Sequence, residues 1–172
     1  MLLLAGASGV GTSMIQLCKM AGAHSIAVSS SHGKLEQCKK LGAFDGINYK
    51  QTPFYSERVK MMTDGEGVDV IQDPVLGTFF NCNLECLAMD SRWVIYGTMG
   101  GYKIKEANLM KLIGKRASIH TSTLRNRSDS YKKDLLTNME RDCWPSFENE
   151  NLKPIIDKVF NLSDAGQALS YM

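Results

Sequence analysis

The chain has 172 residues, of which 44% are hydrophobic and 22% charged, and its formal net charge is +2. This composition is typical of a soluble globular domain, and the small, dispersed charge argues against nucleic acid or an anionic membrane as a partner. No apolar run reaches the roughly 20 residues of a membrane span. The first apolar run also lacks the basic residues of a signal peptide. We therefore expect a cytoplasmic protein.

The cysteines give no sign of a metal centre or of a disulfide framework. Their number is odd, and no second Cys or His pair completes a zinc site around Cys82 and Cys86. The sequence therefore predicts mostly buried, reduced thiols, as in a cytosolic protein, and no bound metal.

Strand and helix patterns alternate along the chain. Apolar runs predict strands at Leu2–Ala5, Ser25–Val28, Asp45–Tyr49, Val68–Gln72, Trp93–Tyr96 and Ala117–Ser122. Helical spacing predicts helices at Gly9–Ala21, Ser31–Leu41, Glu57–Met62, Thr78–Met89, Ala107–Ile113 and Tyr131–Cys143, then an extended Ile155–Phe160 and a terminal helix capped by Ser163 with Asp164. This alternation predicts one α/β domain over residues 1–172, a Rossmann-type doubly wound, mostly parallel six-stranded sheet with helices on both faces.

The first strand leads directly into a turn of small residues. Gly6, Ser8 and Gly11 occupy the three glycine positions of a dinucleotide-binding turn, with Ser8 in place of the second glycine and Gly9 beside it. A helix that begins near Gly9 directs free N–H groups and the positive end of its dipole at a phosphate. We predict a dinucleotide site here; the alternative is a tight strand–helix turn without a ligand.

The end of the second strand discriminates between the two nicotinamide dinucleotides. An NAD site usually has Asp or Glu at this point to bind the ribose 2′-hydroxyl. This chain has Ser29, Ser30 and Ser31, followed by Lys34. Hydroxyls and a nearby cation suit the 2′-phosphate of NADP(H). The alternative is that Lys34 is an ordinary surface lysine.

Six stretches of sequence also carry a family resemblance. In chain order they are AGASGVGT at 5–12, KLGA at 40–43, INYK at 47–50, GVDVIQD at 67–73, SRWVIYGTMGG at 91–101 and STLRNR at 122–127. Together they resemble the cofactor domain of zeta-crystallin-type quinone oxidoreductases. These enzymes form the zinc-independent, NADPH-using branch of the medium-chain dehydrogenase/reductase superfamily.

The resemblance implies roles for three groups of residues. They are Ala7, Ser8, Gly9 and Val10 at the pyrophosphate, Ser31, Lys34 and Tyr49 at the 2′-phosphate, and Tyr96, Gly97, Thr98 and Met99 beside the nicotinamide. It also implies that the chain is a fragment, because family members have a preceding GroES-like domain that forms the other wall of the substrate cleft.

The implied function is hydride transfer from NADPH to a quinone or an α,β-unsaturated carbonyl. The isolated chain is expected to be inactive, because half of the cleft is absent. The alternative is a non-catalytic nucleotide-binding or sensing module on the same fold. No residue pattern identifies a catalytic group. Asp73, at the end of the fourth strand, is either a site residue or a hydrogen-bond acceptor in the turn before Pro74.

The sixth predicted strand indicates a homodimer. In the order 3-2-1-4-5-6 it lies at an edge of the sheet, and its sequence ASIHTS has no proline or charge to prevent pairing. The family resemblance implies pairing of this strand across a twofold axis. The alternative is that residues 121–123 or a loop cover the edge.

Overall fold

A single parallel sheet organises the computed structural model, which describes residues 1–172. Its strands are β1 (Leu2–Leu4), β2 (Ile26–Ser29), β3 (Asp45–Asn48), β4 (Val68–Asp73), β5 (Leu87–Ile95) and β6 (Ser118–Thr121). Their order is β3-β2-β1-β4-β5-β6, and all neighbouring strands are parallel. The predicted fold class is therefore confirmed, and β6 is an edge strand as expected.

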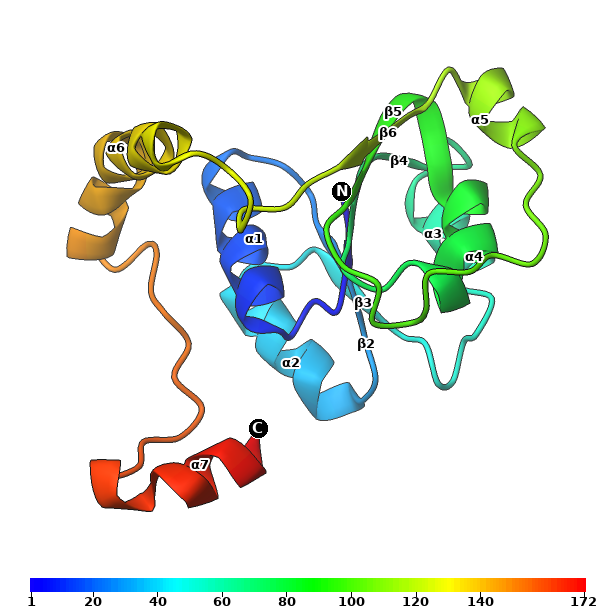
Figure 1. Cartoon of the computed structure of the whole chain (residues 1–172). Coiled ribbons are helices and arrows are strands. Elements are labelled where there is room, and N and C mark those ends of the chain that lie inside the picture. The colour runs from blue at the N-terminus through cyan, green and yellow to red at the C-terminus, as the bar shows by residue number, and fades with distance from the viewer.

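Helices cover both faces of the sheet (Figure 1). One face carries α1 (Gly9–Met20) and α2 (His32–Leu41), and the other carries α3 (Ser56–Met62), α4 (Phe80–Cys86) and α5 (Met110–Lys115). A small buried cluster that includes Leu3 and Ile15 lies beneath the first pair. A larger one that includes Ile71 and Trp93 lies beneath the second group. Burial on both faces explains the continuous apolar runs of the central strands.

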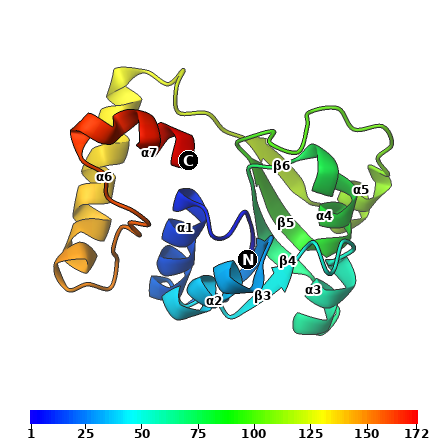
Figure 2. The same ribbon diagram turned by 90° about the horizontal axis from the view of Figure 1, so that it is seen from below.

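The last two helices lie apart from the sheet. Helices α6 (Asp129–Glu148) and α7 (Ala165–Tyr171) lie beyond α1 in both views (Figures 1 and 2). Gln16 of α1 joins the segment between them: its Nε2 donates to the Lys153 carbonyl oxygen at 3.1 Å, and its Oε1 accepts from the Lys153 N–H at 3.0 Å. Leu152 is buried beside this contact. No helix of the chain combines the length and the hydropathy that crossing a membrane requires.

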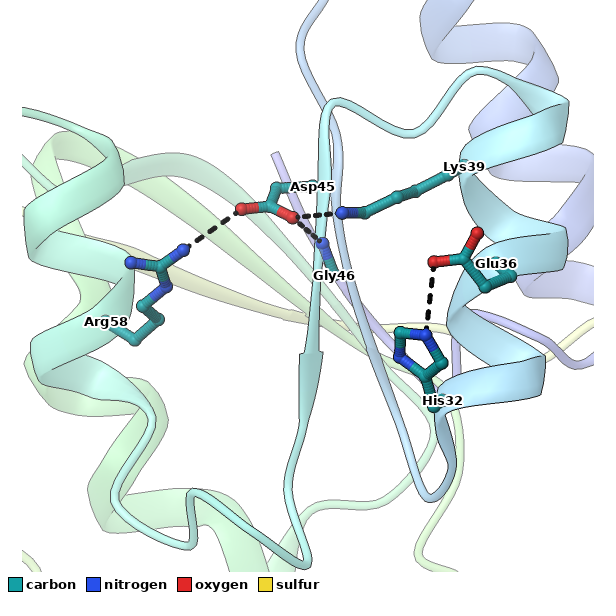
Figure 3. Close-up of polar contacts among 6 residues, drawn as sticks. All are labelled: His32, Glu36, Lys39, Asp45, Gly46 and Arg58. Carbon is teal, nitrogen blue, oxygen red and sulfur yellow. Dashed lines mark hydrogen bonds and ion pairs between the residues drawn. The ribbon is translucent and has the colours of Figure 1, made fainter.

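An acidic residue connects the edge strand β3 to helices on both faces. The Asp45 carboxylate accepts from Lys39 Nζ of α2 at 2.9 Å and lies 3.4 Å from Arg58 Nη2 of α3 (Figure 3). It also accepts from the Gly46 N–H at 2.8 Å. Burial acts to raise the pKa of Asp45, but the bonds from Lys39 and Gly46 and the charge of both cations lower it overall. The carboxylate is therefore charged at neutral pH and holds β3 in place.

The boundary between α4 and β5 differs from the prediction. The expected helix 78–89 ends at Cys86, and the strand begins at once with Leu87, six residues before the expected Trp93. Leu87 is buried and pairs with Val68 of β4. The apolar spacing of this segment fits packing as a helix or as a strand, and pairing with β4 selects the strand.

Two predictions near the C-terminus are wrong. Helix α6 continues through Pro145 to Glu148 instead of ending at Cys143, because the helix is exposed and water can reach the carbonyl that proline leaves without a donor. Asp164 occupies the N-cap position of α7, but neither Ser163 nor Asp164 makes the expected side-chain capping bond. Both residues lie inside a 3₁₀ turn, Leu162–Asp164.

Candidate cofactor-binding site

The predicted site residues lie at the carboxyl ends of β1, β2, β3 and β5. In a doubly wound sheet, ligands bind at this edge where the strand order reverses, here between β1 and β4. The sequence placed these residues on separate segments between positions 7 and 99, and the parallel topology brings them to one edge. The arrangement supports a ligand that extends across several strand ends.

The turn after β1 presents unpaired backbone donors. Ser8 caps α1, because its Oγ accepts from the Gly11 N–H at 3.1 Å and its carbonyl oxygen accepts from the Thr12 N–H at 2.8 Å. The N–H groups of Gly9 and Val10 donate to no protein acceptor. Free N–H donors and the positive end of a helix dipole are the features that favour anion binding. Val10 is 51% exposed, so this end of α1 is accessible from solvent.

Two glycines allow the turn to pack closely, and a third leaves it open. A Cβ on Gly11 would lie 2.5 Å from the carbonyl oxygens of Ala5 and Gly6, and one on Gly6 would lie 2.8 Å from the Cβ of Ala27. A Cβ on Gly9 would have no heavy atom within 4 Å. Gly11 therefore has the packing role of the third glycine, and Gly9 lies on the side that a ligand can approach.

The end of β2 and the start of α2 carry hydroxyls and one cation. Ser31 is the N-cap of α2, and its Oγ accepts from the Lys34 N–H at 3.5 Å. Ser30 is half-buried and the side chain of Lys34 is exposed. The first acidic residue after β2 is Glu36, which lies one turn into α2. Its carboxylate is 3.6 Å from Nε2 of His32 (Figure 3).

Tyr49 directly follows β3 and joins the same region. Its N–H donates to the carbonyl oxygen of Ser29 at 3.1 Å, which places it beside the end of β2. Its half-buried ring packs edge-on against Phe79 with 5.1 Å between the ring centroids. The structure thus brings Tyr49 and the serine segment together, although they are far apart in the sequence.

The loop after β5 pairs with the loop after β4. The Met99 N–H donates to Pro74 at 3.1 Å and the Gly100 N–H to Val75 at 2.8 Å. In return, Gly77 donates to Gly101 at 2.9 Å. Residues 74–78 and 97–101 therefore form one unit, which we call the paired loops. The sequence analysis predicted site residues only in the second of these loops, residues 97–101. The signal for the first loop was a turn-forming segment, Pro74 to Gly77, directly after a strand.

Within the paired loops, the residues predicted to border the nicotinamide differ in exposure. A Cβ on Gly97 would lie 2.6 Å from the Pro74 carbonyl oxygen, so only glycine allows this approach. Thr98 and Met99 are exposed. Tyr96 is half-buried and its hydroxyl has no hydrogen-bond partner. Burial, together with the nearby charge of Asp73, raises the pKa of Tyr96 to about 12, so the phenol is neutral at physiological pH.

Asp73 is a fully buried acceptor, which confirms the second of its two predicted roles. Its Oδ1 accepts from the N–H groups of Val75 at 2.7 Å and Leu76 at 2.8 Å. Its Oδ2 accepts from Asn83 Nδ2 at 3.1 Å and Trp93 Nε1 at 3.0 Å. Four donors satisfy the carboxylate, and it has no exposed surface for a ligand.

Other parts of the chain offer less to a nucleotide. A cleft of about 570 Å³ lies at the opposite, amino-terminal edge of the sheet, and its lining includes His24, Phe44 and Asp69 but none of the predicted residues. No three His, Cys, Asp or Glu side chains lie close enough together to hold a metal ion. The carboxyl edge is therefore the candidate site.

Comparisons with known proteins show the family to which the chain belongs. Residues 9–141 match the family model described as zinc-binding dehydrogenase. A zinc-type alcohol dehydrogenase-like protein of Schizosaccharomyces pombe is 30% identical over 98% of this chain and 47% of its own length. The solved structure of an NAD-dependent alcohol dehydrogenase is 28% identical, with a TM-score of 0.82 over 98% of this chain and 46% of the other. The structure of a quinone oxidoreductase of Escherichia coli, solved with NADPH, is 26% identical. Its TM-score is 0.73, and the match covers 90% of this chain and 47% of the other.

The chain therefore belongs to the zinc-binding dehydrogenase family, a family of nicotinamide-dependent oxidoreductases. Its fold is that of the cofactor-binding domain in the quinone oxidoreductases of the medium-chain dehydrogenase/reductase superfamily, which confirms the resemblance found in the sequence. The chain spans about half the length of the relative and the two solved structures described above.

The geometry of the turn predicts different effects of alanine substitution at Gly9 and at Gly11, two residues further along. Gly11→Ala forces a Cβ against two backbone oxygens, and we expect it to lower the free energy of unfolding by about 1–3 kcal/mol or more. Gly9→Ala meets open space, and we expect a change within about 0.5 kcal/mol. Urea unfolding of the two variants checks this. Equal destabilisation by both would show that α1 does not approach the turn as described.

Proposed function

We propose that this chain is the NADPH-binding domain of a reductase that transfers hydride to a quinone or an α,β-unsaturated carbonyl. The observation that carries the proposal is the combination of unpaired N–H groups after β1 with the serines and Lys34 at the start of α2. Relatives carry both NAD and NADPH in their names, so the choice between them rests on this chain's own residues.

The residues present fit a dinucleotide at the carboxyl edge. The N–H groups of Gly9 and Val10 are free to donate to the pyrophosphate, and the open side of Gly9 allows its approach. With Ala7 and Ser8, these residues surround the positive end of the α1 dipole. An anion bound here would gain hydrogen bonds that the protein leaves unmade.

The 2′-phosphate would lie at the start of α2. Ser30, Ser31 and Lys34 offer hydroxyls and a positive charge, and Tyr49 adds a phenol from the end of the neighbouring strand. The N-terminus of α2 has no acid in its first turn, so nothing on that turn repels the phosphate. A charge-assisted hydrogen bond in such a place contributes about 1.5–3 kcal/mol.

When bound, the dinucleotide supplies the hydride, and this chain positions one side of it. Tyr96, Gly97, Thr98 and Met99 would border the nicotinamide, and the backbone bonds between residues 74–78 and 97–101 would hold this segment in place. The acceptor's other wall would come from a GroES-like domain. No group in this chain is assigned to proton transfer, so orientation is the contribution derived for its residues.

The chain by itself leaves the nicotinamide open to water, so it should reduce acceptors poorly. Steady-state oxidation of NADPH with ortho- and para-quinones checks this. We expect bound NADPH to be oxidised at close to its uncatalysed rate. Fast turnover by these 172 residues would contradict the need for a second domain.

The cofactor preference is tested by one lysine and a control on the same helix. We expect Lys34→Ala to weaken NADPH binding about tenfold and to leave NADH binding nearly unchanged, because only NADPH has the 2′-phosphate. Lys40→Ala removes an exposed charge from the last turn of α2 and should change neither. Calorimetric titration of the parent and both variants with NADPH and with NADH measures all six affinities. Equal losses for NADPH and NADH in Lys34→Ala would make Lys34 a scaffold residue.

We also propose a homodimer through the free edge of β6. The Ser122 N–H donates to Ile95 of β5 at 2.9 Å, and alternation along a strand then directs the Ile119 N–H outward. The exposure of every residue of β6 leaves this edge available to a second copy.

Proline at position 119 tests the edge contact, because it removes an outward donor and leaves the bonds to β5 intact. We expect Ile119→Pro to be monomeric and Ile119→Thr, which keeps the N–H, to remain dimeric. Light scattering at high concentration distinguishes the two states. A parent chain that is already monomeric would disprove the contact.

A further inference from the structure

A buried hydrogen-bond network connects α3 and α4 to the end of β4. The Tyr55 hydroxyl donates to Asn83 Oδ1 at 2.5 Å, and Asn83 Nδ2 donates to Asp73 Oδ2 at 3.1 Å. Trp93 Nε1 of β5 donates to the same carboxylate oxygen at 3.0 Å. All four side chains have no solvent exposure. Their polar groups therefore depend on one another for satisfaction.

The second oxygen of Asp73 holds the first of the paired loops. It accepts from the N–H groups of Val75 and Leu76. Leu76 has φ +60° and ψ −112°, a conformation that residues other than glycine rarely adopt. Strained backbone of this kind persists only where its surroundings impose it, and it occurs often beside ligand sites. The bonds to Asp73 are the constraint here.

The constraint extends to the second loop through the backbone. Pro74 and Val75 accept from Met99 and Gly100, so the loop after β5 takes its position from the loop after β4. In contrast, Ser8 and Ser31 cap α1 and α2, and Lys34 lies in the first turn of α2. Both helices lie on the other face of the sheet, and these three residues make no hydrogen bond to the network. Through hydrogen bonds, the network thus connects to only one part of the candidate site. Tyr49, at the proposed 2′-phosphate position, is linked to Tyr55 only through the ring of Phe79, which both tyrosines contact.

We propose that Asn83 and Tyr55 are positioning residues for the nicotinamide end of the cofactor. They act through Asp73 and the paired loops without touching the ligand. This inference rests on the proposed function, because it assumes a dinucleotide at the carboxyl edge. Its specific consequence is that the two halves of the cofactor depend on different residues. The network orients the nicotinamide half, and the α1 and α2 termini hold the phosphates.

Asn83→Leu and Tyr55→Phe test this division. Asn83→Leu removes a donor to Asp73 and leaves the Tyr55 hydroxyl without its acceptor. Tyr55→Phe removes only the hydroxyl and keeps the ring, which packs against Phe79. Asn81→Leu is the matched control, since it makes the same change on α4, where Asn81 bonds only to the Glu106 carbonyl oxygen.

Each variant is titrated with NADPH and with 2′,5′-ADP, which lacks the nicotinamide half. We expect Asn83→Leu to weaken NADPH binding about tenfold while 2′,5′-ADP binding stays within about twofold of the parent. Tyr55→Phe should also weaken NADPH binding, by a smaller factor, and leave 2′,5′-ADP binding unchanged. Asn81→Leu should change the affinity for neither ligand. At saturating NADPH, the emission of the bound nicotinamide should shift toward that of free NADPH in the two network variants only.

Two outcomes overturn the inference. Equal losses of NADPH and 2′,5′-ADP in a folded variant would show a general structural role, and unchanged NADPH affinity and emission would show no positioning role. If Asn83→Leu does not fold, Tyr55→Phe decides, because its core packing is intact. A parent chain that binds neither ligand would instead disprove the proposed function, so the two failures are distinguishable.

Discussion

The hydrogen bonds of the buried Asp73 carboxylate are the interactions on which the carboxyl edge of the sheet, the candidate cofactor site, depends. A charge taken out of water is costly unless donors surround it, and Asp73 has four of them. They come from the turn after β4, from α4 and from β5. Satisfying one side chain therefore fixes three elements relative to one another. Removing any single donor leaves the others in place but weakens the constraint on the turn.

The rest of the site follows from the geometry of parallel strands. Because the carboxyl ends of all six parallel strands lie at the same edge, the short segments after β1, β2, β3 and β5 meet there, although they are far apart in the sequence. Two helix N-termini add positive potential at this edge, one capped by Ser8 and the other by Ser31. Asp45 lies at the amino-terminal end of β3, away from the candidate site. Its ion pairs with Lys39 of α2 and Arg58 of α3 hold this strand between the two helices (Figure 3).

The sequence was sufficient where local pattern determines structure. The six strands and the turn at Gly6–Gly11 follow from apolar runs and from residues whose size matters within a few positions. The strand order follows from the rule for doubly wound sheets. The sequence was insufficient where contacts between residues far apart in the chain determine the local structure. Leu87 is in a strand because Val68 is its neighbour, and Asp73 is buried because Asn83 and Trp93, ten and twenty residues further on, supply donors. The pairing of the 74–78 loop with residues 97–101 has the same origin and was not predicted.

The central proposal is that the carboxyl edge binds NADPH through backbone donors that the protein leaves unpaired. Titration of NADPH into ¹⁵N-labelled chain, followed by amide resonances, tests it most directly. The account predicts the largest shifts at Gly9, Val10 and Lys34, with smaller ones in residues 97–101 and none around His24 and Asp69. Shifts confined to the amino-terminal edge, or no shifts at saturating NADPH, would contradict it.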